Sequence, residues 1–286
     1  MASLHKFTIV GLVVKESNEA AVRTCALAER WLQGHGVECR VIKHPHESIV
    51  DGLLPETDLL LVFGGDGTIV SVARQSLGMG IPIAGVNFGQ VGFLAELSED
   101  AWEEALGVAL SAGFMIQRRM ALRYALYRGQ ECIHQGEVVN DVVVTRGKVA
   151  RLANLHLGVN GLPFVTLRSD GLILSTPTGA SGYAGSAGGP LVLPTLSAYV
   201  VAAICPYLSS FPPLVLNHET TLCVTVGEAV PDLYLTLDGQ EAHTLAGGDR
   251  LEVSGVPDRI LLADFGRKDY FSRLVQAGFV QCKRSC

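Results

Sequence analysis

The feature that most constrains the fold is an unbroken apolar run that ends in a glycine-rich loop. Residues Leu59–Phe63 are apolar at every position, and Gly64-Gly65-Asp66-Gly67-Thr68 follows at once. A short run of this kind is typical of a parallel strand buried on both faces. A helix is expected from about Ile69 to Gln75, and in open α/β sheets ligands bind at the carboxyl ends of the strands. We therefore expect Asp66 to lie at a ligand site.

The surrounding residues predict a doubly wound α/β domain over residues 1–100. Strands are expected at residues 7–14, 38–42, 59–63 and 81–86, and helices at residues 18–34 and 69–75. Strands that alternate with helices imply a parallel sheet covered by helices on both faces.

The pattern changes after a helix expected at residues 102–110. Strand-like runs without helices between them occupy residues 122–127, 137–145, 153–159, 171–175, 221–226, 234–237 and 250–253. This spacing predicts a mainly β second domain over residues 101–267 and a ligand crevice beside the first domain. Residues 268–286 form a tail, of which residues 268–280 could be helical.

The glycine loop is suited to a polyphosphate. Consecutive glycines let backbone N–H groups approach phosphate oxygens without a clash from Cβ, and a following helix adds the positive end of its dipole. Gly64, Gly65, Gly67 and Thr68 are therefore predicted phosphate or ATP ligands. The Asp66 carboxylate could take a proton from a substrate hydroxyl, although an aspartate that caps a turn or helix is the alternative interpretation.

Two later segments also carry polar groups in unusual surroundings. Asn140-Asp141 interrupts an apolar run, and a ribose diol could supply the partners that buried polar groups need, although a strand end would explain the pair as well. Thr178–Pro190 is too rich in glycine and serine for an ordinary strand or helix, and too short for a linker. We expect this segment to line a binding site.

Together these motifs resemble the NAD kinase family, which phosphorylates the 2′-hydroxyl of the adenosine ribose of NAD to make NADP. The resemblance rests on Gly-Gly-Asp-Gly-Thr, on Asn140-Asp141, and on the stretch that reads Ser-Asp-Gly…Thr-Pro-Thr-Gly…Tyr…Ser-Ala-Gly-Gly-Pro. It implies ATP as donor, Mg²⁺ or another divalent cation, Asp66 as general base and the glycine loop as phosphate cradle. It also implies a homodimer or homotetramer and a C-terminal tail that packs on the first domain.

The resemblance further implies which residues bind NAD. Asp170 would bind the nicotinamide end, the position of Arg168 differs between NAD-selective members and those that accept NADH, and Tyr183 would contact a ring. Here Asp141 replaces the commoner Glu, and Ala180-Ser181-Gly182 replaces Ser-Thr-Ala. The full set of NAD-binding residues implied is Asp66, Gly67, Phe93, Asn140, Asp141, Arg151, Arg168, Asp170, Ser181, Gly182, Tyr183, Ser186 and Gln240.

Other classes find less support. A lipid or sugar kinase that shares only the glycine loop is one alternative, and a non-catalytic dinucleotide-binding regulator is another. The eight histidines show no zinc or hydrolase spacing, and a net charge of −6 argues against a broad nucleic-acid surface. With no apolar stretch of roughly 18 residues and no signal peptide, we expect a cytoplasmic protein without a membrane span. ATP and inorganic polyphosphate both fit as donors.

Overall fold

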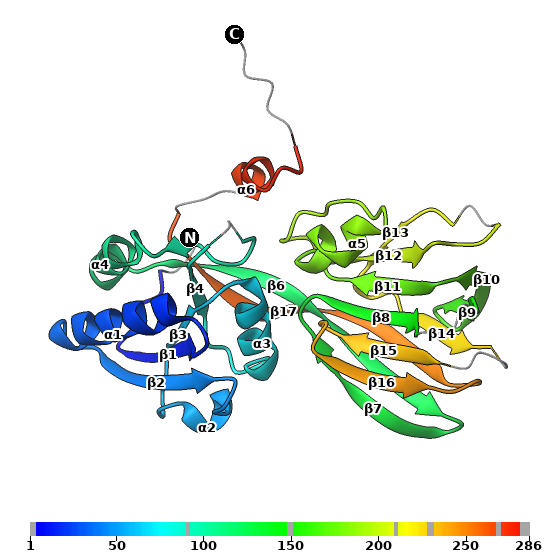
Figure 1. The fold of residues 1–286 in the computed structure, drawn as a ribbon, viewed down its shortest axis with the longest axis horizontal. Coiled ribbons are helices and arrows are strands. Elements are labelled where there is room, and N and C mark those ends of the chain that lie inside the picture. Colours follow the sequence, from blue (N-terminus) through cyan, green and yellow to red (C-terminus); the bar gives the residue numbers. More distant parts are fainter. Residues whose placement is uncertain are drawn as a thin grey trace, which may run out of the picture. The chain divides into compact units, whose positions relative to one another are not determined.

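The computed structural model describes residues 4–89, 92–147, 151–208, 211–227, 232–266 and 270–280. The chain divides into two units, Met1–Arg118 with Ile260–Cys286, and Arg119–Arg259. We call the first the α/β unit and the second the β unit. The chain enters the β unit within strand β6 (Met115–Arg128) and leaves it within strand β17 (Arg250–Asp264) (Figure 1).

The α/β unit is built on a parallel sheet. Its strands are β1 (Ile9–Lys15), β2 (Glu38–His44), β3 (Leu59–Phe63) and β4 (Ile83–Asn87), in the order β2-β1-β3-β4, with β5 (Leu97–Ser98) and the end of β17 both paired with β4. Every residue of β3 is buried, as expected for a central strand covered on both faces.

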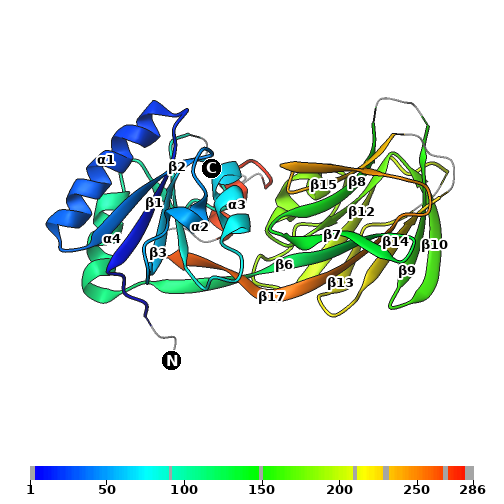
Figure 2. The same ribbon diagram turned by 90° about the horizontal axis from the view of Figure 1, so that it is seen from below.

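Helices cover both faces of this sheet. The apolar side chains of α1 (Glu19–Gly34) and α4 (Trp102–Ala112) share one hydrophobic cluster with Leu59, Leu61 and Phe63 of β3. Helices α2 (Ile49–Gly52) and α3 (Asp66–Gln75) lie on the opposite face (Figure 2). Because α1 follows β1 on one face and α3 follows β3 on the other, the neighbouring strands β1 and β3 form a topological switch point, where such sheets bind ligands. The glycine loop follows β3 at this point.

Helix α4 belongs to the α/β unit, although we expected the second domain to begin near residue 100. Trp102 and Leu106 of α4 are buried in the same cluster as Cys25 and Leu32 of α1. This apolar packing holds α4 against the parallel sheet, and the division of the chain lies after Arg118 instead.

The β unit consists of two antiparallel arrangements of strands. One contains parts of β6 and β17 with β7 (Glu131–Val138), β9 (Ala153–Val159), β10 (Leu162–Ser169) and β14 (Leu222–Val226). The other has the order β13-β12-β11-β8-β15-β16. Its strands are β13 (Leu214–Asn217), β12 (Ala198–Ile204), β11 (Gly171–Ser175), β8 (Asp141–Arg146), β15 (Leu233–Leu237) and β16 (Glu241–Leu245). Side chains from both sets form one apolar core. The predicted fold class, an α/β unit followed by a mainly β unit, is confirmed.

The glycine-rich segment covers the outer face of the six-stranded sheet. It contains a short 3₁₀ helix, η1 (Gly179–Ser181), and one turn of α-helix, α5 (Tyr183–Ser186). Ala180 and Ala184 pack against Ile173 and Val200, which lie on the sheet face opposite the main core.

The described part of the C-terminal tail lies in the α/β unit as helix α6 (Tyr270–Gln276). Cys282 and Cys286 fall outside the described residues. No helix within the described ranges is long and apolar enough to cross a membrane.

Candidate functional site

The glycine loop is shorter than the sequence predicted, because helix α3 begins at Asp66 and not near Ile69. Gly65 is the N-cap residue and has an extended backbone, with φ −80° and ψ 179°. Asp66, Gly67 and Thr68 therefore form the first turn of the helix. A carboxylate in this turn is stabilised by the positive end of the helix dipole.

The Asp66 carboxylate is held by three backbone N–H groups from the segment after β4. Oδ2 accepts from Phe93 N at 2.6 Å, and Oδ1 accepts from Leu94 N at 3.2 Å and from Ala95 N at 3.4 Å. These bonds fix the carboxylate between the end of β3 and the loop that follows β4, at the carboxyl edge of the parallel sheet.

The glycines of the loop differ in what surrounds them. A Cβ on Gly64 would lie 2.8 Å from Oγ1 of Thr68, whose side chain is buried. This burial favours a packing role for Thr68 over the predicted phosphate contact. Gly65 and Gly67 are exposed, have no positive φ, and would place a Cβ in space where no described atom lies within 4 Å. Their lack of a side chain is not required by the packing of the described residues.

Phe93 lies beside Asp66, but its ring packs against the C-terminal tail. The ring centroids of Phe93 and Tyr270 are 6.3 Å apart, and those of Phe93 and Phe279 are 5.6 Å apart. The ring is half-buried by these contacts, and we expected it to contact the dinucleotide.

In the β unit, Asn140 and Asp141 lie where β7 ends and β8 begins, so the run read as one strand over 137–145 is two strands. The Asp238 carboxylate accepts the N–H groups of Val139 at 3.0 Å, Asn140 at 2.6 Å and Asp141 at 3.2 Å. Asp238 was not among the predicted site residues. An Asp-Gly pair is typical of a hairpin turn, and Asp238-Gly239 lies between β15 and β16, with φ +52° at Asp238 and +64° at Gly239.

The same edge of the six-stranded sheet receives the start of the glycine-rich segment. Thr176 donates to the carbonyl of Val139 at 2.7 Å through Oγ1 and to the carbonyl of Asn140 at 2.8 Å through its N–H. Asn140 Oδ1 and Thr178 Oγ1 are buried and have no hydrogen-bond partner among the described residues. Buried polar atoms are normally paired, so these two atoms are candidates for ligand contacts. Thr178 was not assigned a role from the sequence.

Asp141 is the titratable group of this cluster that is most strongly affected by its surroundings. Burial raises the pKa of Asp141 to about 6, and the nearby Asp238 carboxylate adds to the effect. The Asp141 carboxyl therefore changes charge close to neutral pH.

Asp170 is paired with Arg146, although Arg168 lies closer to it in the chain. Arg146 Nε donates to Asp170 Oδ1 at 2.5 Å and Arg146 Nη2 donates to Asp170 Oδ2 at 3.1 Å. The Arg168 guanidinium lies over the ring of Tyr207, 5.4 Å from its centroid. Ser169, between these two residues, is buried and belongs to β10, and the side chains of Arg168 and Asp170 contact different neighbours.

The structure does not bring Asp170 to the Asn140 cluster. Gly171 pairs with Thr145 and Ser175 pairs with Asp141, so Asp170 and Asp141 lie at opposite ends of the β8–β11 pair. The five residue steps along β8 span about 17 Å at about 3.4 Å per residue. The predicted NAD residues of the β unit thus form two groups at the two ends of one strand pair.

The remaining predicted residues lie on the surface of the β unit. Tyr183 is 45% exposed, Ser186 Oγ donates to the carbonyl of Gly182 at 3.2 Å, and Ser181 ends η1. Arg151 and Gln240 are exposed, outside the strands β9 and β15 respectively. Within the described ranges, no three His, Cys, Asp or Glu side chains gather into a group that could hold a metal ion.

Comparison with known proteins gives matches in both halves of the chain. A family model described as the ATP-NAD kinase N-terminal domain matches residues 46–111. A second, described as the ATP-NAD kinase C-terminal domain, matches residues 139–263. The similarity is therefore not confined to the glycine loop.

Whole-chain relatives agree with these matches. A protein named NAD kinase from Nitratidesulfovibrio vulgaris (strain DP4) is 42% identical over 279 residues, which cover 97% of this chain and 93% of the relative. One from Geobacter sulfurreducens is 38% identical over 251 residues, covering 85% of this chain and 88% of the relative.

Two solved structures share the fold. The crystal structure of yeast NADH kinase complexed with NADH superposes with a TM-score of 0.83 at 24% identity, covering 98% of this chain and 90% of that one. The crystal structure of an NAD kinase from Archaeoglobus fulgidus in complex with ATP gives a TM-score of 0.75 at 25% identity, covering 94% of this chain and 100% of that one.

Proposed function

Because this chain belongs to the NAD kinase family of phosphotransferases, we propose that it transfers the γ-phosphoryl group of ATP to the 2′-hydroxyl of the adenosine ribose of NAD, which yields NADP. The observation that carries the proposal is the way in which Asp66 is held. A carboxylate has about four lone-pair positions, and three of those on Asp66 accept backbone N–H groups. One position on Oδ2 is left to accept the proton of a hydroxyl.

Asp66 acts as the general base in this proposal. A base must be positioned within hydrogen-bond reach of the proton it takes, and rigid positioning is worth a large part of the rate of phosphoryl transfer. The N–H bonds from Phe93 and Leu94 supply that rigidity. As the 2′-oxygen attacks the γ-phosphorus, its proton passes to Oδ2 of Asp66, and the bond from the γ-phosphorus to the bridging oxygen breaks to release ADP.

The start of helix α3 forms the phosphate cradle. No described atom lies within 4 Å of a Cβ built on Gly65 or Gly67, at the start of a helix of 10 residues, and the N-terminus of a helix favours phosphate oxygens. The loop follows β3 at the switch point of the sheet, which also supports this role.

The β unit binds the acceptor NAD. Asn140 Oδ1 and Thr178 Oγ1, both buried and without a partner in the described part of the chain, would hydrogen-bond ribose hydroxyls, and the Asp141 carboxyl lies in the same cluster. The residues that would bind the adenosine are Ser181, Gly182, Tyr183 and Ser186. Gln240 and Arg151 would also contact NAD, as the family resemblance implies. Asp170 would contact the nicotinamide end.

A divalent cation, Mg²⁺ or a similar ion, would neutralise the charge of the transferred phosphate. Magnesium in such sites keeps several waters and is held mainly by phosphates and one or two carboxylates. Within the described residues, no three His, Cys, Asp or Glu side chains gather into a group that could hold this cation. We assign no protein ligand to it.

Self-association, which the family resemblance implies, and a cytoplasmic location are also part of the proposal. Strand β10 lies at one end of its sheet and exposes Leu162 (72%) and Phe164 (52%), as edges that take part in interfaces do. Sedimentation or light scattering of the purified chain would measure whether it forms a homodimer or homotetramer.

The function is tested by incubating the purified chain with NAD, ATP and Mg²⁺ and measuring NADP with an NADP-specific dehydrogenase. An analogue that lacks the 2′-hydroxyl should give no phosphorylated product, and polyphosphate in place of ATP reports the donor preference. Turnover of a sugar or diacylglycerol but not of NAD would overturn the proposal. Binding of NAD without turnover would indicate a regulator instead.

A further inference from the structure

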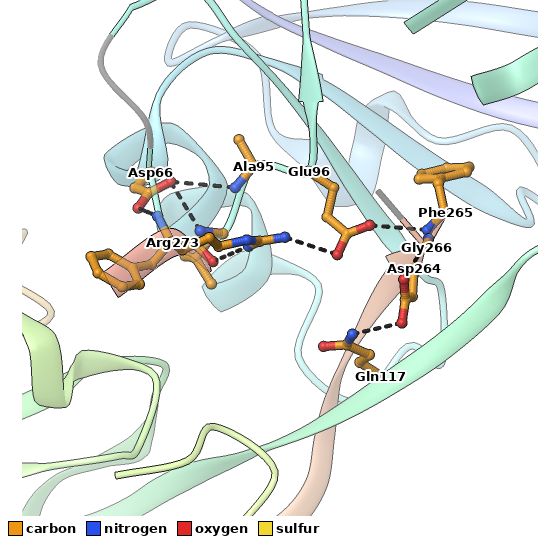
Figure 3. Close-up of polar contacts among 10 residues, drawn as sticks. Asp66, Ala95, Glu96, Gln117, Asp264, Phe265, Gly266 and Arg273 are labelled. Atoms are coloured by element: carbon orange, nitrogen blue, oxygen red, sulfur yellow. Dashed lines mark hydrogen bonds and ion pairs between the residues drawn. The ribbon is translucent and has the colours of Figure 1, made fainter. Parts of the chain in front are cut away.

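The segment that holds Asp66 is itself held by the C-terminal helix. Arg273 of α6 donates through Nη1 to the carbonyl oxygen of Phe93, and through Nη2 to the Glu96 carboxylate at 2.9 Å. Figure 3 shows Asp66 and Arg273 beside the same short stretch of backbone, with the guanidinium directed at Glu96.

One peptide group connects the two side chains. The carbonyl of Phe93, which accepts from Arg273, belongs to the same peptide unit as the N–H of Leu94, which donates to Asp66 Oδ1. A hydrogen bond at each end fixes the plane of this peptide, and hydrogen bonds in series strengthen one another. The Arg273 guanidinium is therefore connected to the Asp66 carboxylate through the planar Phe93–Leu94 peptide group.

The contact is buried and well supported. The side chains of Arg273 and Glu96 are 8% and 7% exposed, and Glu96 Oε2 also accepts the N–H of Phe265 at 2.9 Å. The rings of Tyr270 and Phe279 pack against Phe93 from the same tail. The tail thus contacts both the backbone and the side chain of the residue that donates the shortest bond to Asp66.

We propose that Arg273 is a positioning residue for the phosphoryl transfer, which orients the Phe93–Leu94 peptide and through it the Asp66 carboxylate. The inference rests on the proposed role of Asp66 as base. It assigns a positioning role to a residue of the C-terminal helix that contacts the Phe93 carbonyl and the Glu96 carboxylate.

Removing Arg273 alone would leave a buried Glu96 charge unpaired and could unfold the unit, so a double variant is the informative one. Arg273→Met with Glu96→Gln removes both charges, and replacing both members of a buried pair is far better tolerated than replacing one. The Gln side chain can still accept the N–H of Phe265. The bond from residue 273 to the carbonyl of Phe93 remains absent.

The expected result for the double variant is a separation of stability from turnover. Its thermal midpoint should recover relative to Arg273→Met, whereas its kcat should stay about 10- to 100-fold below that of the wild type, the effect of a small displacement of a reacting group. The KM for NAD should change by less than about twofold, because the β unit is untouched. Arg273→Lys keeps a donor and should recover part of the lost kcat.

Arg128→Met is the matched control, because it breaks another arginine–carboxylate pair, with the buried Asp249, in the β unit, whereas Asp66 belongs to the α/β unit. It should lower stability and leave kcat unchanged. A double variant whose kcat returns with its stability would reduce Arg273 to a structural residue and overturn the inference.

A second measurement does not depend on activity. Amide hydrogen exchange at Leu94 should be faster in the double variant than in the wild type, and unchanged in Arg128→Met. If the wild type makes no NADP, the proposed function fails, and the exchange rate still decides whether Arg273 holds the segment. Unchanged exchange at Leu94 would overturn the inference whatever the activity.

Discussion

The space that a side chain on Gly92 would occupy is filled by the carboxylate of Asp66. A Cβ built on Gly92 overlaps both carboxylate oxygens and Cγ of Asp66. Gly92 has no positive φ, so its backbone does not require glycine. The requirement comes instead from the close approach of Asp66, which must reach the N–H groups of the residues that follow.

We therefore expect Gly92→Ala to displace the Asp66 carboxylate and to lower kcat by about 10²-fold, the order of effect that misplacing a general base produces. Steady-state NADP formation measures it. Gly34→Ala is the control, because Gly34 ends α1 and a Cβ there meets no described atom within 4 Å. Equal activity of both variants would show that the Asp66 position is not critical.

Asp66→Asn should lower kcat by at least about 10²-fold, because the amide cannot act as a base. It should also cost about 1–3 kcal/mol of stability, since an amide group cannot accept all three N–H groups that the carboxylate accepts.

Asp58→Asn separates the two effects of that substitution. The Asp58 carboxylate also accepts two backbone N–H groups, from Thr8 at 2.8 Å and Ile9 at 3.2 Å, within the same unit. This variant should lose stability in urea denaturation and keep its kcat. A well-folded Asp66→Asn protein with normal turnover would limit Asp66 to a structural role.

Gly67→Ala should make the chain more stable and less active. Gly67 is the second residue of α3, and alanine in place of glycine stabilises a helix by up to about 1 kcal/mol. No described atom lies within 4 Å of the added Cβ, so we attribute a loss of activity in a stable variant to a bound phosphate that needs the space. A raised KM for ATP with an equal or higher thermal midpoint is the expected outcome. Unchanged kinetics would argue against the phosphate cradle.

The sequence was sufficient for features that depend on local pattern. The apolar run of β3, the alternation of strands and helices, and the Asn140-Asp141 interruption each follow from residues that are adjacent in the chain. Strand β12 was missed, because Ala198–Ile204 is apolar throughout, and periodicity alone does not distinguish a short continuous apolar strand from a buried helix segment.

Contacts between distant residues could not be predicted in the same way. Asp238 and Asn140 are 98 residues apart, and Arg273 and Phe93 are 180 apart. Nothing in the local sequence of an Asp-Gly turn or of a C-terminal helix indicates which backbone groups it will bind. The partner of Asp170 illustrates the same limit, because Arg168 is nearer in the chain and Arg146 is nearer in the fold.

The pKa of Asp141 predicts a pH dependence of stability. Burial raises this pKa from 3.8 to about 6, so the folded state favours the protonated carboxyl. The stability that the group contributes is therefore fully present below about pH 4 and is lost as the pH rises through about 6. Asp141→Asn should become more stable relative to the wild type over that range, by about 1–3 kcal/mol in total. Denaturation of both proteins at pH 4, 5, 6 and 8 measures this, and a constant difference would contradict it.

Because Asp170 pairs with Arg146 and Arg168 lies over Tyr207, the roles of Asp170 and Arg168 can be tested separately. Arg146→Met removes both bonds to the Asp170 carboxylate. If Asp170 binds the nicotinamide end of NAD, the KM for NAD should rise by about tenfold, because a mispositioned acceptor loses roughly the energy of one hydrogen bond.

Arg168→Gly leaves the Asp170–Arg146 pair intact and removes only the side chain that lies over Tyr207. It should therefore raise kcat/KM for NADH relative to NAD by giving the neutral, puckered dihydronicotinamide more room, with little change in the KM for NAD. The test is to measure kcat and KM for NAD and for NADH with the wild type and both variants. A wild type that already uses NADH well, or an unchanged NADH/NAD ratio in Arg168→Gly, would show that Arg168 does not set selectivity. A normal KM for NAD in Arg146→Met would show that Asp170 does not bind NAD.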